Sequence, residues 1–461
     1  MNILVIGNGF DLAHDLPTTY QDFLKFVEVM KQVLSGETEA GRIDWKDIDF
    51  RIEEQIRYIL RLGSDEIILQ KKKWEKLIAD NCWIEYFLQC QSYIGKNWID
   101  FESEISKVIQ EFDKNLINIS ISSTAQRHIL PFGAFSNYFI SDIHKLEADR
   151  EKAFMEYIEK FDAAFSSQTK SEYRESFYAE HPIEKLPDIS YKEIINRLEE
   201  DLNKLILALE IYIADYVDKL TVEQKSPDIV RLLEEVEEYE RLDTFISFNY
   251  SHTLNRVYGV EIKQTDNDVN FDFIHGEAKT SNSENNMILG IDEYIKGKKK
   301  NKNLLFLAYK KYYQRIYKET GNQSKCWADT IKKDYTSYKK KIKEAKTRSL
   351  YQDSANDPFV SRGFLRMPND ATYKIHNLYI FGHSLDITDK DILKSLILND
   401  NVQTKIFYHN EEAHAKQIAN LVKVIGQDEL IRRTGGSTKT IYFELQQKME
   451  PIKKGRDILE I

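Results

Sequence analysis

Residues 1–24 read MNILVIGNGFDLAHDLPTTYQDFL, and this stretch decides the class of fold. The apolar run at residues 3–6 predicts a short buried strand, and a helical pattern follows the glycines Gly7 and Gly9. Glycines directly after a strand permit a tight turn, and the N-terminus of the next helix offers N–H groups to an anion. A strand, a glycine turn and a helix in this order predict the first βα unit of an α/β fold.

The turn itself, Gly7-Asn8-Gly9-Phe10-Asp11, fits two interpretations. It is neither a complete G-x-G-x-x-G motif nor a Walker sequence. It either cradles a phosphate or only ends the strand with a backbone that needs positive φ at one of its glycines. The turn alone does not decide between them.

Further along the chain, short apolar segments bounded by Gly, Asn, Asp or His predict strands that are buried on both faces. They are residues 244–248, 271–275, 287–291, 375–381, 404–408 and 440–444. Residues 20–240 instead show the spacing of long amphipathic helices. The sequence therefore predicts an α/β fold: a Rossmann-like, mostly parallel sheet interrupted by a large helical insertion and a smaller basic helical insertion.

The same pattern predicts the domain boundaries. The discontinuous nucleotide-binding core comprises residues 1–24, 240–295 and 366–461. The helical insertion covers residues 25–239, and the basic helical insertion covers residues 296–365. Right-handed crossovers would bring the loops after the strands to one edge of the sheet, where open α/β sheets bind their ligands.

Composition excludes several classes of protein. The 461 residues are 42% apolar and 30% charged, which is typical of a folded globular chain. No apolar run approaches the roughly 18 residues of a membrane span, and the N-terminus lacks the basic region of a signal peptide. The three cysteines form no CxxC pair, and no His/Cys/Asp cluster has metal-ligand spacing. We therefore expect a cytoplasmic protein with no membrane partner and no metal.

Charge is distributed unevenly. Residues 296–348 carry 18 Lys and Arg against 4 Asp and Glu, in a chain whose net charge is −10. Such a segment is either a solvated lysine-rich helical face or a surface for nucleic acid. Tyrosines interleaved with these lysines fit base stacking as well as ordinary helix packing.

Three more polar turns follow predicted strands. Asn249 and Tyr250 come after 244–248, and His275 and Gly276 end 271–275. The third, Gly382-His383-Ser384, follows 375–381 and precedes a helix that begins near Thr388. Each turn alone is compatible with a purely structural role. Because a histidine titrates near neutral pH, His275 is the best candidate for an acid or base.

Together these motifs resemble the bacteriophage abortive infection AbiH family. The stretches are NILVIGNGFDLAHDLPTTYQDFL, FISFNYSHTL, IHG, ILGI and YIFGHSLDITDKDIL, in that order. The same succession is similar, more distantly, to sirtuin-like NAD-binding domains. The resemblance implies an anti-phage abortive infection effector that hydrolyses NAD at the bond between nicotinamide and ribose. The four-cysteine zinc module of the deacetylating sirtuins is absent from this sequence.

The resemblance also implies roles for individual residues. Gly7 and Gly9 would lie beneath the pyrophosphate with Asp11 nearby, Asn249 would hold the nicotinamide ribose, and His275 would be the catalytic base. Phe10 stands where smaller residues are usual and would narrow the floor of the site. The implied nucleotide-binding residues are Gly7, Asn8, Gly9, Phe10, Asp11, Tyr250, Gly276, Gly382, His383 and Ser384.

Two other classes of function remain open. A serine hydrolase would use Ser384 as nucleophile in a strand-to-helix turn, with His409 or His414 as base. A nucleic-acid-binding or nucleotide-sensing effector without NADase activity would instead use residues 296–348 as its docking surface. Whichever of the three functions applies, we expect a phage-derived trigger and a second copy of the chain as further partners.

Overall fold

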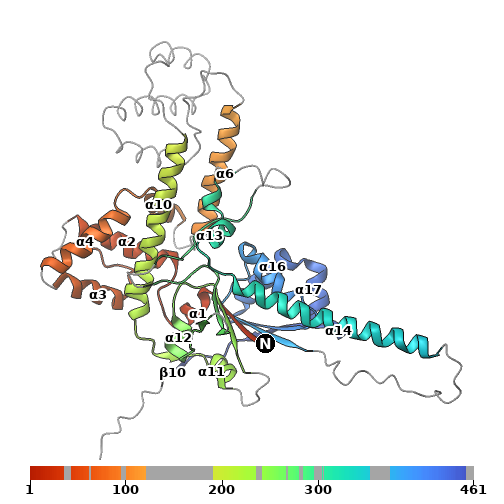
Figure 1. Cartoon of the computed structure of the whole chain (residues 1–461). Helices are drawn as coiled ribbons and strands as arrows, with labels where there is room; N and C mark the ends of the chain where they lie inside the picture. Colours follow the sequence, from red (N-terminus) through yellow and green to blue (C-terminus); the bar gives the residue numbers. More distant parts are fainter. Residues whose placement is uncertain are drawn as a thin grey trace, which may run out of the picture. The chain divides into compact units, whose positions relative to one another are not determined.

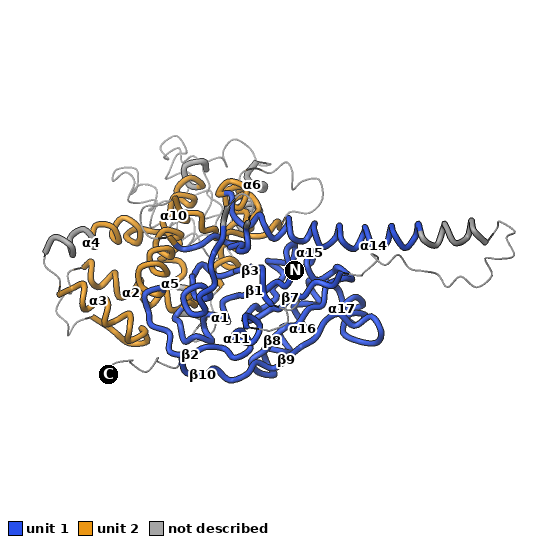
Figure 2. Tube along the Cα trace, turned by 60° about the horizontal axis from the view of Figure 1, so that its bottom comes forward, with its two compact units in different colours: residues 1–17, 218–278, 319–461 blue, residues 18–217, 279–318 orange. Residues whose placement is uncertain are grey.

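The computed structural model describes residues 1–35, 43–61, 64–94, 100–120, 191–234, 241–265, 268–279, 284–294, 304, 306–353 and 374–452 (Figure 1). The chain divides into two compact units (Figure 2). The sheet unit comprises residues 1–17, 218–278 and 319–461, and the helical unit comprises residues 18–217 and 279–318. These divisions fall at other residues than the boundaries predicted from the sequence.

The sheet unit is built on six parallel strands in the order β6-β3-β1-β7-β8-β9. The strands are β1 (Asn2–Ile6), β3 (Thr244–Ser247), β6 (Phe271–Phe273), β7 (His376–Phe381), β8 (Val402–Tyr408) and β9 (Ile441–Leu445). Counted along the chain, the order is 3-2-1-4-5-6, which is that of doubly wound dinucleotide-binding sheets. The prediction of a mixed α/β fold with a parallel sheet is confirmed.

One predicted strand, residues 287–291, is wrong. Met287–Ile291 are buried, but they belong to the helical unit and form no strand. The side chain of Gln314 bonds both backbone groups of Leu289, and the Ile291 N–H donates to the Tyr309 carbonyl at 2.7 Å. Buried backbone groups need partners, and these contacts take the place of a sheet ladder. An apolar run of five residues indicates burial but cannot specify its hydrogen-bond partners.

Helices cover both faces of the sheet. In the sheet unit they are α1 (Asn8–Ala13), α11 (Pro227–Glu234), α12 (Thr253–Tyr258), α14 (Gln323–Asp353), α15 (Lys390–Ile397), α16 (Glu411–Ile425) and α17 (Gln427–Thr434). Short strands pair as β2 (Gln224–Lys225) with β10 (Glu450–Pro451) and as β4 (Gln264–Thr265) with β5 (Asp268–Val269). Local signals set the ends of α16, because the Asn410 side chain accepts from the Ala413 N–H and Gly426 has φ +90°.

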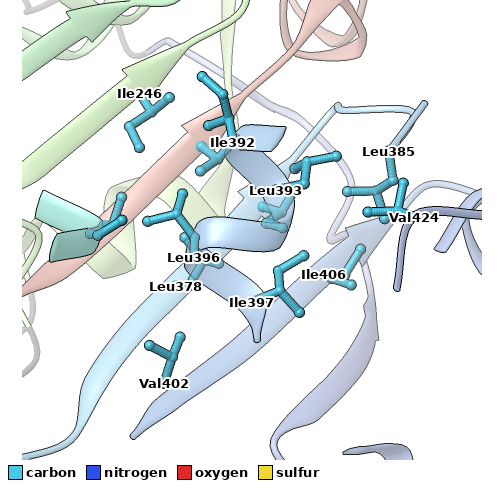
Figure 3. Packing of buried hydrophobic residues seen from close by; sticks show 14 of the residues in the cluster. Ile246, Leu378, Leu385, Ile392, Leu393, Leu396, Ile397, Val402, Ile406 and Val424 are labelled. Carbon is cyan, nitrogen blue, oxygen red and sulfur yellow. The ribbon is translucent and has the colours of Figure 1, made fainter. Parts of the chain in front are cut away.

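Two hydrophobic cores lie on opposite faces of the sheet. Ile3 and Val5 of β1 contribute to one core, and Leu4 and Ile6 contribute to the other. The first core is packed mainly by α15, whose residues Ile392, Leu393, Leu396 and Ile397 lie over β7 and β8 (Figure 3). The second core is closed by α11, α12 and Phe10. Alternate residues of β1 are therefore buried on both sides, as expected for a central parallel strand.

The helical unit contains α2 (Tyr20–Leu34), α3 (Phe50–Arg61), α4 (Ser64–Ile78), α5 (Cys82–Ile94), α6 (Phe101–Ser120), α10 (Tyr191–Ile211) and α13 (Lys311–Tyr317). A capping box begins α2, because Thr19 accepts from the Asp22 N–H and Asp22 accepts from the Thr19 N–H. Asn81 caps α5 and donates to the Asp201 carbonyl of α10 at 2.8 Å. Among the described residues, no helix is both long enough and apolar enough to cross a membrane.

Candidate functional site

The glycine turn after β1 lies directly against the glycine turn after β7. The Gly9 N–H donates to the Gly382 carbonyl at 2.8 Å, and Gly382 has φ +67°. A Cβ on Gly382 would lie 2.1 Å from the Phe10 nitrogen, and a Cβ on Gly7 would lie 2.8 Å from the His383 Cα. Because β1 and β7 are neighbours in the sheet, only glycines allow the two backbones to approach this closely.

The backbone donors of the first turn are used within the protein. The Gly7 N–H donates to the Phe381 carbonyl at 3.2 Å, and the Phe10 N–H donates to the Gly7 carbonyl at 2.7 Å. With Gly9 also bonded, these three N–H groups are directed to carbonyls of the chain and not to a phosphate. The Phe10 ring is completely buried in the second core, where it contacts His14, Tyr258 and Phe381.

Asn249 connects the turn after β3 to the turn after β1. Its Nδ2 donates to the Gly7 carbonyl at 3.0 Å, and its backbone N–H donates to the Ser247 Oγ at 3.1 Å. The side chain is 95% buried, and its Oδ1 has no hydrogen-bond partner among the described residues. A buried amide oxygen without a partner is costly, so this acceptor is available to a donor group on a ligand.

Asp11 of α1 lies in a buried hydroxyl network. The Ser251 Oγ donates to the Asp11 Oδ2 at 2.6 Å, and the Thr253 Oγ1 donates to the Ser251 Oγ at 3.1 Å. Burial raises the pKa of Asp11 to about 6, although these hydroxyl contacts oppose the rise. The network therefore ties α1 to the N-terminus of α12 beside Asn249.

A carboxylate lies between two histidines from different strand ends. The Asp389 Oδ1 is 3.3 Å from the His275 Nε2, and the Asp389 Oδ2 is 3.6 Å from the His383 Nε2. His275 follows β6, His383 follows β7, and Asp389 ends the 3₁₀ turn Ile387–Asp389 before α15. All three side chains are buried, and the ring of Phe248 contacts both imidazoles. Because the carboxylate of Asp389 is buried in a region of low dielectric, it favours an N–H on each of the two ring nitrogens that face it.

Backbone geometry fixes the tautomer of His383. Its Nδ1 accepts from the Leu385 N–H at 2.8 Å, so the neutral ring carries its proton on Nε2, toward Asp389. Leu385 has φ +58°, a strained conformation for a branched residue, and it is completely buried. By the same logic, a His275 that donates from Nε2 to Asp389 keeps Nδ1 as its basic nitrogen.

The loop that carries these groups is fixed by α16. Gln417 donates to the His383 carbonyl at 3.2 Å, and Asn420 donates to the Ser384 carbonyl at 2.9 Å. Asp386 accepts from the Thr388 N–H and caps the 3₁₀ turn, at the place where the sequence predicts the start of a helix. The loop is therefore a rigid scaffold for His383 and Asp389.

The other sequence-predicted residues take different places. Gly276 has φ +78° in the turn that follows β6, and the Tyr250 carbonyl accepts from the Ala278 N–H. Ser384 is exposed, and within the described part of the chain no hydrogen bond joins it to His409 or His414. His414 instead stacks on Tyr408.

Sequence reasoning missed Asp389 as a site residue. Its position in the first turn of a predicted helix already explained an acidic side chain there, because such charges complement the helix dipole. Only the folded sheet brings the turn after β7 beside His275, 114 residues earlier. Among the described residues, no group of three or more His, Cys, Asp or Glu side chains is arranged to hold a metal ion.

A family comparison agrees with this organisation. The model of the family described as bacteriophage abortive infection AbiH matches residues 3–409, which is most of the chain and includes every residue of the site. The chain belongs to the AbiH family. The resemblance predicted from the sequence is thus confirmed, and the family assigns this AbiH protein a role in abortive infection against phage. No curated protein and no solved structure matches the chain.

Proposed function

We propose that this AbiH protein is a cytoplasmic nucleotide-binding hydrolase that cleaves NAD at the nicotinamide–ribose bond once a phage-derived trigger activates it. The observation that carries the proposal is the His275–Asp389 pair at the carboxyl edge of a doubly wound sheet, next to Asn249 on the adjacent strand end. Nucleotides bind at this edge in sheets of this strand order.

The chemistry needs a base and a group that positions the ribose. The bond between ribose C1′ and the nicotinamide nitrogen breaks with its electron pair on nitrogen, which neutralises the pyridinium charge. Water adds to C1′ through an oxocarbenium-like state, and its proton passes to the His275 Nδ1. The products are nicotinamide, ADP-ribose and a proton.

Two neighbouring groups support this step. Asp389 holds the His275 proton on Nε2 and stabilises the imidazolium that forms, which is the role of the carboxylate in Asp–His pairs. The Asn249 Oδ1 accepts a hydrogen bond from a ribose hydroxyl. Orienting both the base and the ribose supplies the proximity contribution to catalysis.

The glycine turn has a positioning role in this proposal. Its carbonyl at Gly7 holds the amide of Asn249, and its N–H groups are bonded within the chain. We therefore assign the pyrophosphate no hydrogen bond from Gly7, Gly9 or Phe10. Gly382 and Ser384 remain next to the adenosine half, with the Ser384 side chain exposed.

The test is NAD turnover by purified protein, with and without extract of phage-infected cells as the source of the trigger, and with products identified by mass. We expect His275→Gln to lower kcat at least about 100-fold, as removal of a general base typically does. Asn249→Ala should also lower kcat, because the ribose loses the acceptor that orients it. His409→Gln is the matched control, because His409 is exposed and lies outside the site. Unchanged turnover in His275→Gln or Asn249→Ala would contradict the proposed mechanism.

A further inference from the structure

The structure separates the basic segment 296–348 into two kinds of charge. In the helical unit, Lys310 lies 2.6 Å from the Glu293 carboxylate and Lys311 lies 2.7 Å from the Glu102 carboxylate, and both lysines are buried. Lys318 donates to the Asn285 Oδ1 at 3.0 Å. These charges are used inside the fold. The exposed basic side chains within the described part of the segment are concentrated on α14 of the sheet unit.

One face of α14 fixes the helix to the sheet unit. Trp327, Ala328 and Ile331 are buried in the first core, and the Ser324 N–H donates to the Asp272 Oδ2 at 2.6 Å. The Asn401 side chain donates to the Ile331 carbonyl at 3.1 Å. The first turns of α14 are therefore a rigid part of the fold, and the helix continues beyond them (Figure 2).

Exposed lysines lie beside and opposite this buried face of α14. Lys332, Lys339 and Lys343 follow at intervals of seven and four residues, which places them in one line along the helix. Lys333 and Lys340, also seven residues apart, form a second line beside it. At 1.5 Å per residue, the exposed lysine face (residues 332–343) extends over about 16 Å.

The acidic neighbours compensate this charge only in part. Asp334 is directed to His376 at 3.2 Å and to Lys374 at 3.5 Å. The pair of Lys340 and Glu344, at 4.0 Å, is highly exposed, and such pairs contribute little. The lysine face therefore presents a local positive field on a chain whose net charge is −10.

Two tyrosines of the segment, Tyr309 and Tyr335, are engaged in contacts within the protein. Tyr309 is buried in the helical unit, and its hydroxyl donates to the Ile195 carbonyl. Tyr335 donates to Asp400, and its ring is covered by the Lys339 ammonium at 4.2 Å. Single-stranded nucleic acid is usually held by bases stacked on aromatic rings, whereas sequence-independent binding of a duplex relies on its phosphates.

We propose that the exposed lysine face of α14 binds the phosphate backbone of a nucleic-acid duplex, without regard to sequence. Its length spans several phosphates along one strand, and its lysines supply point charges without bidentate geometry. This surface is separate from the His275–Asp389 pair, so binding and hydrolysis are independent properties.

The test is fluorescence anisotropy of the full chain with labelled DNA duplex, RNA duplex and single-stranded DNA of equal length, each over a series of salt concentrations. We expect duplex binding that weakens as salt rises. The slope of log affinity against log salt concentration should become shallower by about 3 when Lys332, Lys333 and Lys340 are all changed to Gln, because each phosphate contact contributes about 0.9. The matching triple change to Arg keeps the charge and should keep the slope. Comparing the affinities for the DNA duplex and the RNA duplex shows which kind of duplex the protein binds.

A matched control carries the same change in net charge elsewhere on the sheet unit. Lys394, Lys416 and Lys448 are exposed, and changing all three to Gln should leave the slope as it is. Equal losses in the two triple variants, tighter binding of the single strand, or no duplex binding at low salt would overturn the proposal. NAD turnover should be the same in both triple variants, so failure of either proposal is recognised separately.

Discussion

At the residue scale, Asp389 is the decisive side chain of the site. It is a positioning residue: it contacts the Nε2 of His275 and is expected to act through that ring. His383 shares the same carboxylate, and the Leu385 N–H fixes which of its nitrogens carries the proton. Replacing the carboxylate by an amide therefore changes proton positions with little change in shape.

We predict that Asp389→Asn lowers kcat for NAD at least about 100-fold, because an amide N–H facing the His275 Nε2 moves the ring proton to Nδ1 and removes the base. The pH profile should lose its acidic limb, where protonation of the base lowers the rate, and ring nitrogen chemical shifts of His275 should report the other tautomer. Asp391→Asn is the control, because Asp391 is exposed two residues further along the chain. Equal activity of the two variants would show that Asp389 is only structural.

At the element scale, the site depends on close contact between the turn after β1 and the turn after β7. We predict that Gly382→Ala lowers the free energy of unfolding by about 3 kcal/mol or more, because its Cβ would meet the Phe10 nitrogen at 2.1 Å and its φ is +67°. Gly436 has φ +65°, but a Cβ added there would have no atom within 4 Å, so Gly436→Ala incurs only the backbone strain. Urea denaturation of the two variants measures the difference, and equal midpoints would refute the steric argument.

Strands and turns differ in how far the sequence specifies them. The apolar runs that become β1, β3, β7, β8 and β9 are recognisable because each must be buried, and the polar turns after them follow from the chain direction in a parallel sheet. This is why Asn249 and His275 could be placed at one edge before the fold was known. The bonding of Gly9 to Gly382 could not, because it depends on a contact between turns 373 residues apart.

At the scale of the whole molecule, the sheet unit is assembled from three separate stretches of chain. The middle stretch, residues 218–278, is closed on itself by His252. The His252 Nδ1 is 2.9 Å from the Asp218 Oδ2, and its Nε2 is 3.1 Å from the Glu277 Oε2. Arg256 also contacts Asp218, at 3.2 Å. One imidazolium thus joins the first residue of this stretch to its next-to-last residue.

This joint predicts a pH dependence of stability. Burial by itself lowers the pKa of His252, but the hydrogen bonds to Asp218 and Glu277 raise it to about 9, above the ordinary histidine value of 6.5. Between these two pH values the folded state binds the proton and the unfolded state does not. The contribution of His252 to stability is therefore fully present below pH 6.5 and is lost as pH rises through 9. We expect wild-type protein to lose at most about 3 kcal/mol of unfolding free energy over this range, and His252→Gln to lose much less. His14, whose pKa burial lowers to about 4, is neutral throughout, so His14→Gln should keep the wild-type slope. Denaturant titrations at pH 6.5 and pH 9 measure the change in unfolding free energy. Equal losses of unfolding free energy in wild type and His252→Gln would exclude His252 as the joint.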